Sequence, residues 1–123
     1  MGVPGNTKEP GINPFIGEFS VSNTAVEIFT GYGNLYGFLV QNNSGADVFL
    51  QIFDKATGDA VVVGTTVPNF TYKIAADGIF GKDKNDSPLL AMNRGLKVAV
   101  TSTRTGGGAP TSAATCQFWY RNA

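Results

Sequence analysis

Apolar and polar residues alternate with a period of two in several short runs along the chain. The clearest runs are 70–75 (FTYKIA) and 96–101 (LKVAVT), and this spacing is typical of strands that bury one face. Clusters of Gly, Asn, Asp and Ser separate the runs about every 8–12 residues, as they do in sandwiches and barrels. The strands that we expect span residues 15–20, 24–30, 35–42, 46–55, 60–63, 70–75, 96–101 and 114–121.

This series of short strands, without any visible long amphipathic helix, predicts an all-β chain. Helix is expected only as one turn at 89–92 (LLAM), and the length of 123 residues fits one domain with its own core. The expected fold is an antiparallel β-sandwich, jelly-roll-like, with about eight strands. An immunoglobulin-like sandwich is the alternative, although Cys116 and Trp119 share one predicted strand and so lack the Cys…Trp…Cys pattern of true immunoglobulin domains.

The segments 35–42 and 46–55 are the two strongest predicted strands, and the residues NNSG at 42–45 predict a tight hairpin between them. Both segments are apolar on both faces. In the second, Phe49 and Phe53 lie on the face opposite to the Val, Leu and Ile side chains. A strand that is covered on both sides is either central or forms an interface, so Phe49 and Phe53 are candidate interface residues.

The first 14 residues are rich in Gly and Pro, and each Pro fixes φ and removes a hydrogen-bond donor. We therefore expect an extended N-terminal arm at 1–14, followed by a single sandwich domain at 15–123. A frayed chain end is the alternative. Two apolar residues flank the last proline of the segment and favour an arm that docks on a partner. The candidate arm residues are Pro10, Ile12, Pro14 and Phe15.

Charge is low and balanced: 15% of the residues are charged, and nine Lys and Arg offset nine Asp and Glu. Such a chain lacks the electrostatic footprint of a protein that binds nucleic acid or an anionic membrane, and it has no apolar run long enough for a spanning helix. We expect neither partner. Low charge with 42% hydrophobic residues favours a surface that another copy or another molecule covers. Because the start, MGVPGNTKEPGINPFIG, does not resemble a signal peptide, we expect synthesis in the cytoplasm without export.

The sequence offers little catalytic chemistry. It has no His, and its only thiol, Cys116, lies within a predicted strand. The glycines at 31–37 and 106–108 lack the spacing of nucleotide-binding loops. The run DKND at 83–86 carries oxygen ligands, but not at the spacing of a calcium loop. The sequence does not exclude a pair of carboxylates that hydrolyses glycosides, since it does not set the distance between two carboxylates. We expect no enzyme, no catalytic residue, no metal and no cofactor.

Two interpretations of four aromatic residues remain open. Tyr32, Tyr36, Trp119 and Tyr120 are suited to an aromatic platform for a sugar ring, and the same residue types dominate cores and interfaces. Exposure beside a pocket favours the sugar platform, whereas burial between subunits favours an interface. Trp119 is included among the candidate interface residues.

Three stretches carry a resemblance to a known group of proteins. The first, QNNSGADVFLQIFDKA at 41–56, joins an Asn/Gly turn to a strand that ends in an aromatic-Asp-Lys-Ala group. The others are VGTTVP at 63–68 and NRGLKVAVT at 93–101. They are similar to stretches in small virion proteins of tailed bacteriophages, of the capsid cement, decoration or head-fibre type. The resemblance implies a small jelly-roll protein of the phage particle, commonly a trimer, and it implies no catalytic residues.

The function that we expect is that of a structural virion protein. It would bind the outer surface of a phage capsid as a homotrimer, with the major capsid protein as its partner, and stabilise or decorate the particle. Neutral copies pack densely without mutual repulsion, and the arm would reach across subunit boundaries. The alternative is a carbohydrate-binding module of a phage fibre or tail that attaches to host glycans. A small hydrolase ranks third.

Overall fold

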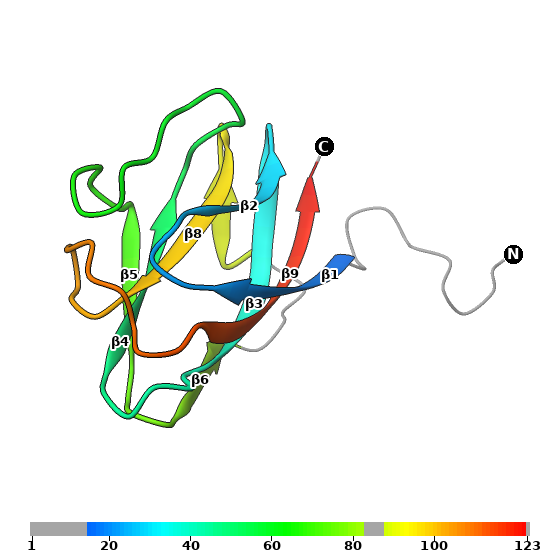
Figure 1. Ribbon diagram of the computed structural model, residues 1–123. Coiled ribbons are helices and arrows are strands. Elements are labelled where there is room, and N and C mark those ends of the chain that lie inside the picture. Colours follow the sequence, from blue (N-terminus) through cyan, green and yellow to red (C-terminus); the bar gives the residue numbers. More distant parts are fainter. Residues whose placement is uncertain (1–14, 83–87, 123) are drawn as a thin grey trace, which may run out of the picture.

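Two antiparallel β-sheets pack face to face in this protein (Figure 1). The computed structural model describes residues 15–82 and 88–122, and these residues contain strands but no helix. They accordingly include no helix that is long and apolar enough to cross a membrane. The strands are β1 (Phe15–Val21), β2 (Val26–Thr30), β3 (Gly33–Gln41), β4 (Val48–Phe53), β5 (Phe70–Ile74), β6 (Ile79–Lys82), β7 (Leu90–Met92), β8 (Gly95–Thr101) and β9 (Ala114–Asn122).

The strand order explains how the chain wraps around its core. One sheet has the order β1-β9-β3-β6, with β7 also paired to β3, and the other has the order β2-β8-β4-β5. Only β4 and β5 follow each other as neighbours in the second sheet. The connections from β1 to β2, β2 to β3, β3 to β4, β5 to β6, β7 to β8 and β8 to β9 pass between the sheets. Such crossing connections are those of a jelly roll, so the predicted all-β, jelly-roll-like sandwich is confirmed.

Inward-facing side chains of both sheets fill the space between them. Leu50 and Val98 are fully buried there. They lie in the predicted strands 46–55 and 96–101. Phe38 of β3 lies at the centre of an aromatic group: its ring centroid is 5.0 Å from that of Tyr72 in the other sheet and 6.4 Å from that of Phe118. Ring contacts of this kind contribute beyond the area that they bury, so Phe38 helps to hold the two sheets together.

Three local predictions differ from the structure. The helical turn expected at 89–92 is wrong, because residues 90–92 form β7 and pair with the first residues of β3. Residues 60–63 form no strand, and Val63 makes only an isolated bridge to Thr66. Strand β6 was not expected at all, and it pairs with the far half of β3. Short strands depend on which backbone edge lies beside them, and a local stretch of sequence does not contain that information.

The chain bends at 44–46, but the predicted hairpin is wrong because β3 and β4 belong to different sheets. Asn42 is buried and builds this corner. Its side-chain Oδ1 accepts a hydrogen bond from the Ser44 N–H at 2.8 Å, and its Nδ2 donates to the carbonyl oxygens of Ala46 and Ala75, each at 2.9 Å. The side chain thereby satisfies backbone groups of two connections, and the chain crosses from one sheet to the other instead of doubling back.

Candidate functional site

The outer face of the β2-β8-β4-β5 sheet is covered by the protein's own loops. Gln51, Phe53 and Ala99 alternate with core residues and point away from the space between the sheets, yet all three are fully buried. The cover consists of the loop 54–69, which follows β4, and the loop 102–113, which follows β8; they are green and orange in Figure 1. Both faces of β4 are therefore covered within one protomer, one by the core between the sheets and the other by the two loops.

Gln51 holds the loop 102–113 against this sheet. Its Nε2 donates to Oγ1 of Thr101 at 2.8 Å and to the carbonyl oxygen of Gly106 at 3.0 Å. The two covering loops also touch each other at Gly64, where φ is +97° and an added Cβ would lie 2.9 Å from the backbone nitrogen of Gly107. The backbones approach so closely because neither residue carries a side chain.

Charged residues fix the start of the loop 54–69. Arg94 donates to the Asp59 carboxylate through Nε at 2.6 Å and Nη2 at 2.8 Å, and Asp54 Oδ1 accepts the backbone N–H of Arg94 at 2.8 Å. The hydrogen bond from Arg94 holds the pKa of Asp59 well below its ordinary value of 3.8. The pairing of Asp59 with Arg94 lowers the pKa of Asp59 and also anchors the loop. The shifted pKa is therefore explained by a structural role.

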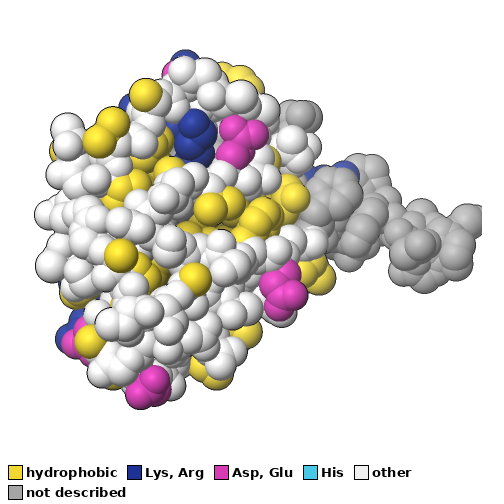
Figure 2. All heavy atoms as spheres, in the orientation of Figure 1, with side chains coloured by type: hydrophobic (Ala, Val, Ile, Leu, Met, Phe, Trp, Pro, Cys, Tyr) yellow, Lys and Arg dark blue, Asp and Glu magenta, His cyan; other side chains and the backbone are white. Residues whose placement is uncertain are grey.

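The outer face of the β1-β9-β3-β6 sheet receives no such cover from the part of the chain that the structure describes. Three large apolar side chains stand out from it: Ile16 is 65% exposed, Leu39 37% and Ile79 65%. Register places Ile16 of β1 directly beside Trp119 of β9, on the same side of the sheet. We call this surface the open face and define its apolar members as Ile16, Leu39, Ile79 and Trp119. In the view of Figure 2, charged side chains form small separate groups and no large charged patch.

The candidate arm residues are placed only in part. Pro10, Ile12 and Pro14 lie outside the described residues. Phe15 is the first residue of β1 and pairs with Tyr120 of β9. The segment 1–14 therefore joins the sandwich at the strand whose next residue, Ile16, belongs to the open face.

The three other candidate interface residues lie in different surroundings. Phe53 is fully buried inside the protomer, so its assignment to an interface is corrected: it is a core residue beneath the covering loops. Phe49 is half-buried, and the guanidinium carbon of Arg104 lies 5.1 Å from its ring centroid. Only Trp119 lies on the open face. Sequence reasoning did not select Ile16, Leu39 or Ile79, because their shared surface is set by the register of separate strands.

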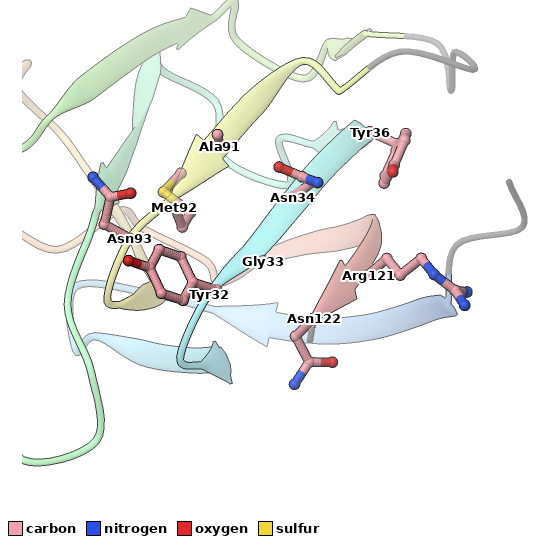
Figure 3. A pocket seen from close by; sticks show the side chains of 9 residues that line it. All are labelled: Tyr32, Gly33, Asn34, Tyr36, Ala91, Met92, Asn93, Arg121 and Asn122. Atoms are coloured by element: carbon pink, nitrogen blue, oxygen red, sulfur yellow. The ribbon is translucent and has the colours of Figure 1, made fainter. Parts of the chain in front are cut away.

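A pocket of about 350 Å³ opens at the end of the open face where β3 begins and β9 ends (Figure 3). Asn34 pairs with Arg121 of β9 on one side and with Ala91 of β7 on the other, so these side chains form one row across the sheet. Tyr32, in the turn before β3, is 69% exposed, whereas Tyr36 is 4% exposed. In Figure 3 the two Tyr side chains lie to either side of Asn34.

The structure places two of the four aromatic residues considered for a sugar platform at this pocket, and Trp119 lies outside its lining. Tyr32 and Tyr36 line the pocket, and Trp119 lies on the same sheet face, opposite Gly37 in the strand register. Tyr120 instead points inward, with its ring stacked on Phe29 at 5.4 Å between centroids. Sequence reasoning missed the polar partners of this pocket, because strand register alone brings Asn34 and Arg121 side by side.

Neither a nucleophile nor a metal cluster accompanies this pocket. Cys116 is fully buried in β9, and burial raises the pKa of its thiol to about 12, so the thiolate is strongly disfavoured. Among the side chains of 15–82 and 88–122, no three His, Cys, Asp or Glu residues are grouped as a metal would require. The chemistry of the pocket is that of hydrogen-bonding amides and phenols, with one guanidinium.

Comparisons with known proteins add one finding. No protein-family model matches the chain, and no curated protein matches it either. Among solved structures, the crystal structure of PirA is similar, with a TM-score of 0.45 and 11% sequence identity over 87% of this chain and 94% of that chain. A similarity at this level carries no conclusion about function.

Proposed function

We propose that this protein is a structural, non-enzymatic component of a phage particle, which binds the outer surface of the capsid as a homotrimer and stabilises or decorates it. The observation that carries the proposal is the open face. One outer face of the sandwich is closed by the protein's own loops, whereas the other presents Ile16, Leu39, Ile79 and Trp119. Exposed apolar residues that share one surface are a feature of protein-binding sites.

The resemblance to small phage virion proteins supports the proposal from a different part of the molecule. The stretch 41–56 covers the corner after β3 and strand β4, the stretch 63–68 lies in the covering loop, and the stretch 93–101 includes β8. All three thus belong mainly to the closed sheet and its loop. In this proposal the closed sheet is the scaffold shared with such proteins, and the open face carries the contact that is particular to this chain.

The argument for self-association changes with the structure. The apolar outer side of β4 no longer requires a second copy, since the loops 54–69 and 102–113 bury it. The trimer proposal instead depends on the open face and on the segment 1–14, which precedes Phe15, the first residue of β1. Sedimentation equilibrium of the full chain should give three times the 12.9 kDa mass of one chain.

Charged substitutions on the open face should abolish particle binding. In the double variant Leu39→Asp with Ile79→Asp, two carboxylates would have to lose water at the contact, so we expect at least a tenfold, roughly 1.4 kcal/mol, weaker association. The measurement is the fraction of protein that co-sediments with purified tailed-phage particles. The thermal midpoint should stay close to that of the unaltered chain, because both side chains are exposed.

A matched control is available on the loop 54–69, where Val62 and Val67 are also exposed apolar residues. The double variant Val62→Asp with Val67→Asp should co-sediment like the unaltered protein. Equal loss in both double variants would mean that added charge alone prevents binding. A native protein that never sediments with particles of capsid mass would refute the proposal itself.

Removal of the segment 1–14 should separate attachment from folding. Within residues 15–82 and 88–122, every strand begins at or after Phe15, so the truncated chain should keep its thermal unfolding midpoint. Prolines restrict the free segment and lower the entropy lost when it is ordered on a partner, so its removal should reduce particle occupancy or dissociate the oligomer. Thermal unfolding and co-sedimentation of the truncated chain test both statements. Unchanged occupancy would exclude a role for the arm, and loss of folding would place these residues in the core.

A further inference from the structure

The asparagines of the described chain fall into two groups. Asn23, Asn42, Asn43 and Asn69 each use their side-chain amide in hydrogen bonds to other parts of the fold. The other asparagines that the structure describes are Asn34, Asn93 and Asn122, and all of them line the pocket at the end of the open face.

No side-chain hydrogen bond engages these three amides within the described part of the chain; Asn93 takes part only through its backbone N–H, which donates to Asp54. An amide carries two N–H donors and an acceptor oxygen, and the fold gives these groups no structural task. They stem from three separate segments, namely β3, the turn after β7 and the end of β9. All three are nevertheless in the lining of one pocket, so a polar ligand there would meet amide groups from three segments.

We infer that this pocket binds a saccharide unit. Neighbouring hydroxyl groups of a sugar both donate and accept hydrogen bonds, and an amide does the same, so Asn34, Asn93 and Asn122 match that chemistry. Tyr32 presents an exposed aromatic ring at one side of the pocket (Figure 3), and an aromatic ring packs against the apolar face of a sugar ring. The volume of about 350 Å³ lies within the size range of small-ligand pockets.

The lining combines amide and phenol groups, and both kinds of group hydrogen-bond to the hydroxyl groups of a neutral sugar. This inference is independent of the proposed attachment to a capsid, because it concerns the pocket and not the apolar members of the open face.

Saturation-transfer NMR on the full chain with glucose, N-acetylglucosamine and glucuronate, each at millimolar concentration, tests the inference. We expect transfer to at least one of the three sugars. Tyr32→Ala should remove the signal, and Asn34→Ala should weaken binding about tenfold through loss of the amide hydrogen bonds. The emission of Trp119, the single tryptophan, provides a second readout from the neighbouring row of the sheet.

Two matched variants control for effects outside the pocket. Gln41→Ala removes an exposed amide from the same sheet face, and Phe70→Ala removes an exposed aromatic ring from β5; neither residue lines the pocket. Both variants should bind the sugar like the unaltered chain. Absence of transfer to all three sugars would overturn the inference, as would a signal that persists when Tyr32→Ala and Asn34→Ala are combined. Because no particle takes part in this experiment, its outcome leaves the proposed capsid attachment to its own test.

Discussion

Replacement of Phe38 by alanine is expected to lower the free energy of unfolding by about 3–5 kcal/mol, the range for a fully buried Phe. Phe38 is buried between the sheets, with its ring centroid 5.0 Å from Tyr72 and 6.0 Å from Phe80. A truncated side chain removes contacts to both sheets at once and leaves a cavity that close-packed strands cannot collapse. Urea unfolding of both proteins at one protein concentration measures the difference.

Phe70→Ala is the matched control for this prediction. Phe70 also lies in a strand, but it is exposed, so its loss should cost less than about 1 kcal/mol. Similar losses in the two variants would contradict the assignment of Phe38 to the centre of the core. Co-sedimentation of the Phe70 variant with particles should remain normal, since this residue lies outside the open face.

Replacement of Gln51 by glutamate is expected to destabilise the protein in a pH-dependent way. Nε2 of Gln51 donates to the carbonyl oxygens of Gly106 and Thr103, at 3.0 and 3.4 Å. An ionised carboxylate has no proton to donate and would face these oxygens in a fully buried position, where ionisation is strongly disfavoured. The introduced carboxyl group should therefore have a raised pKa in the folded state.

The sign of the pH effect follows from that raised pKa. Above pH 4.3, roughly the ordinary value for Glu, the unfolded chain releases the proton while the folded chain retains it. The folded state then binds more protons, so stability falls as the pH rises. By pH 7 the loss relative to pH 4 should reach about 3–4 kcal/mol. The measurement is the difference in unfolding free energy between Gln51→Glu and the unaltered chain at each pH.

Gln41→Glu provides the control, because Gln41 is exposed at the end of β3. Its effect should stay within about 0.5 kcal/mol and change little between pH 4 and pH 7. A Gln51 variant that follows the unaltered chain at every pH would mean that the loop 102–113 is not held by this side chain. Limited proteolysis should cut that loop in the Gln51 variant at pH 7 and spare it at pH 4.

Both stability predictions bear on the proposed function through the closed sheet. If Gln51 holds the loop 102–113 in place, this part of the outer side of β4 stays covered, and the open face remains an apolar surface available to a partner. A variant that released the loop would uncover the sheet around Gln51, where Ala99 is its register partner. Such a protein should aggregate without gaining particle binding. This result would distinguish specific attachment to the particle from non-specific hydrophobic association.

Local patterns were sufficient for much of the sandwich. The alternation in 70–75 and 96–101 predicted β5 and β8, and the structure confirms both strands. The absence of long amphipathic helices predicted an all-β fold, which the described residues confirm. These patterns work because a strand with one buried face has to place its apolar side chains at every second position. The residues at 42–45 marked a break between two strands for a separate reason, since Asn and Gly suit changes of chain direction.

The sequence did not predict which distant segments pair or contact each other in the sheets. Whether Leu90–Met92 forms a helical turn or a strand depended on the free edge of β3, and only the folded chain supplies that edge. The turn at 42–45 was predicted as a hairpin, and the hydrogen bonds of Asn42 to the connection after β5 made it a corner between sheets. In both cases a contact with a segment far away in the chain decided the outcome.

The candidate site divides in the same way. The sequence by itself determined that the chain is neutral, lacks His, and carries apolar residues on both faces of 46–55. Only the tertiary structure decided that the loops 54–69 and 102–113 cover the second of those faces and that Phe53 is a core residue. Only strand register placed Ile16 beside Trp119, and Asn34 beside Arg121. Periodicity states which residues of one strand share a face, whereas cover and neighbourhood depend on packing between distant segments, which no local pattern encodes.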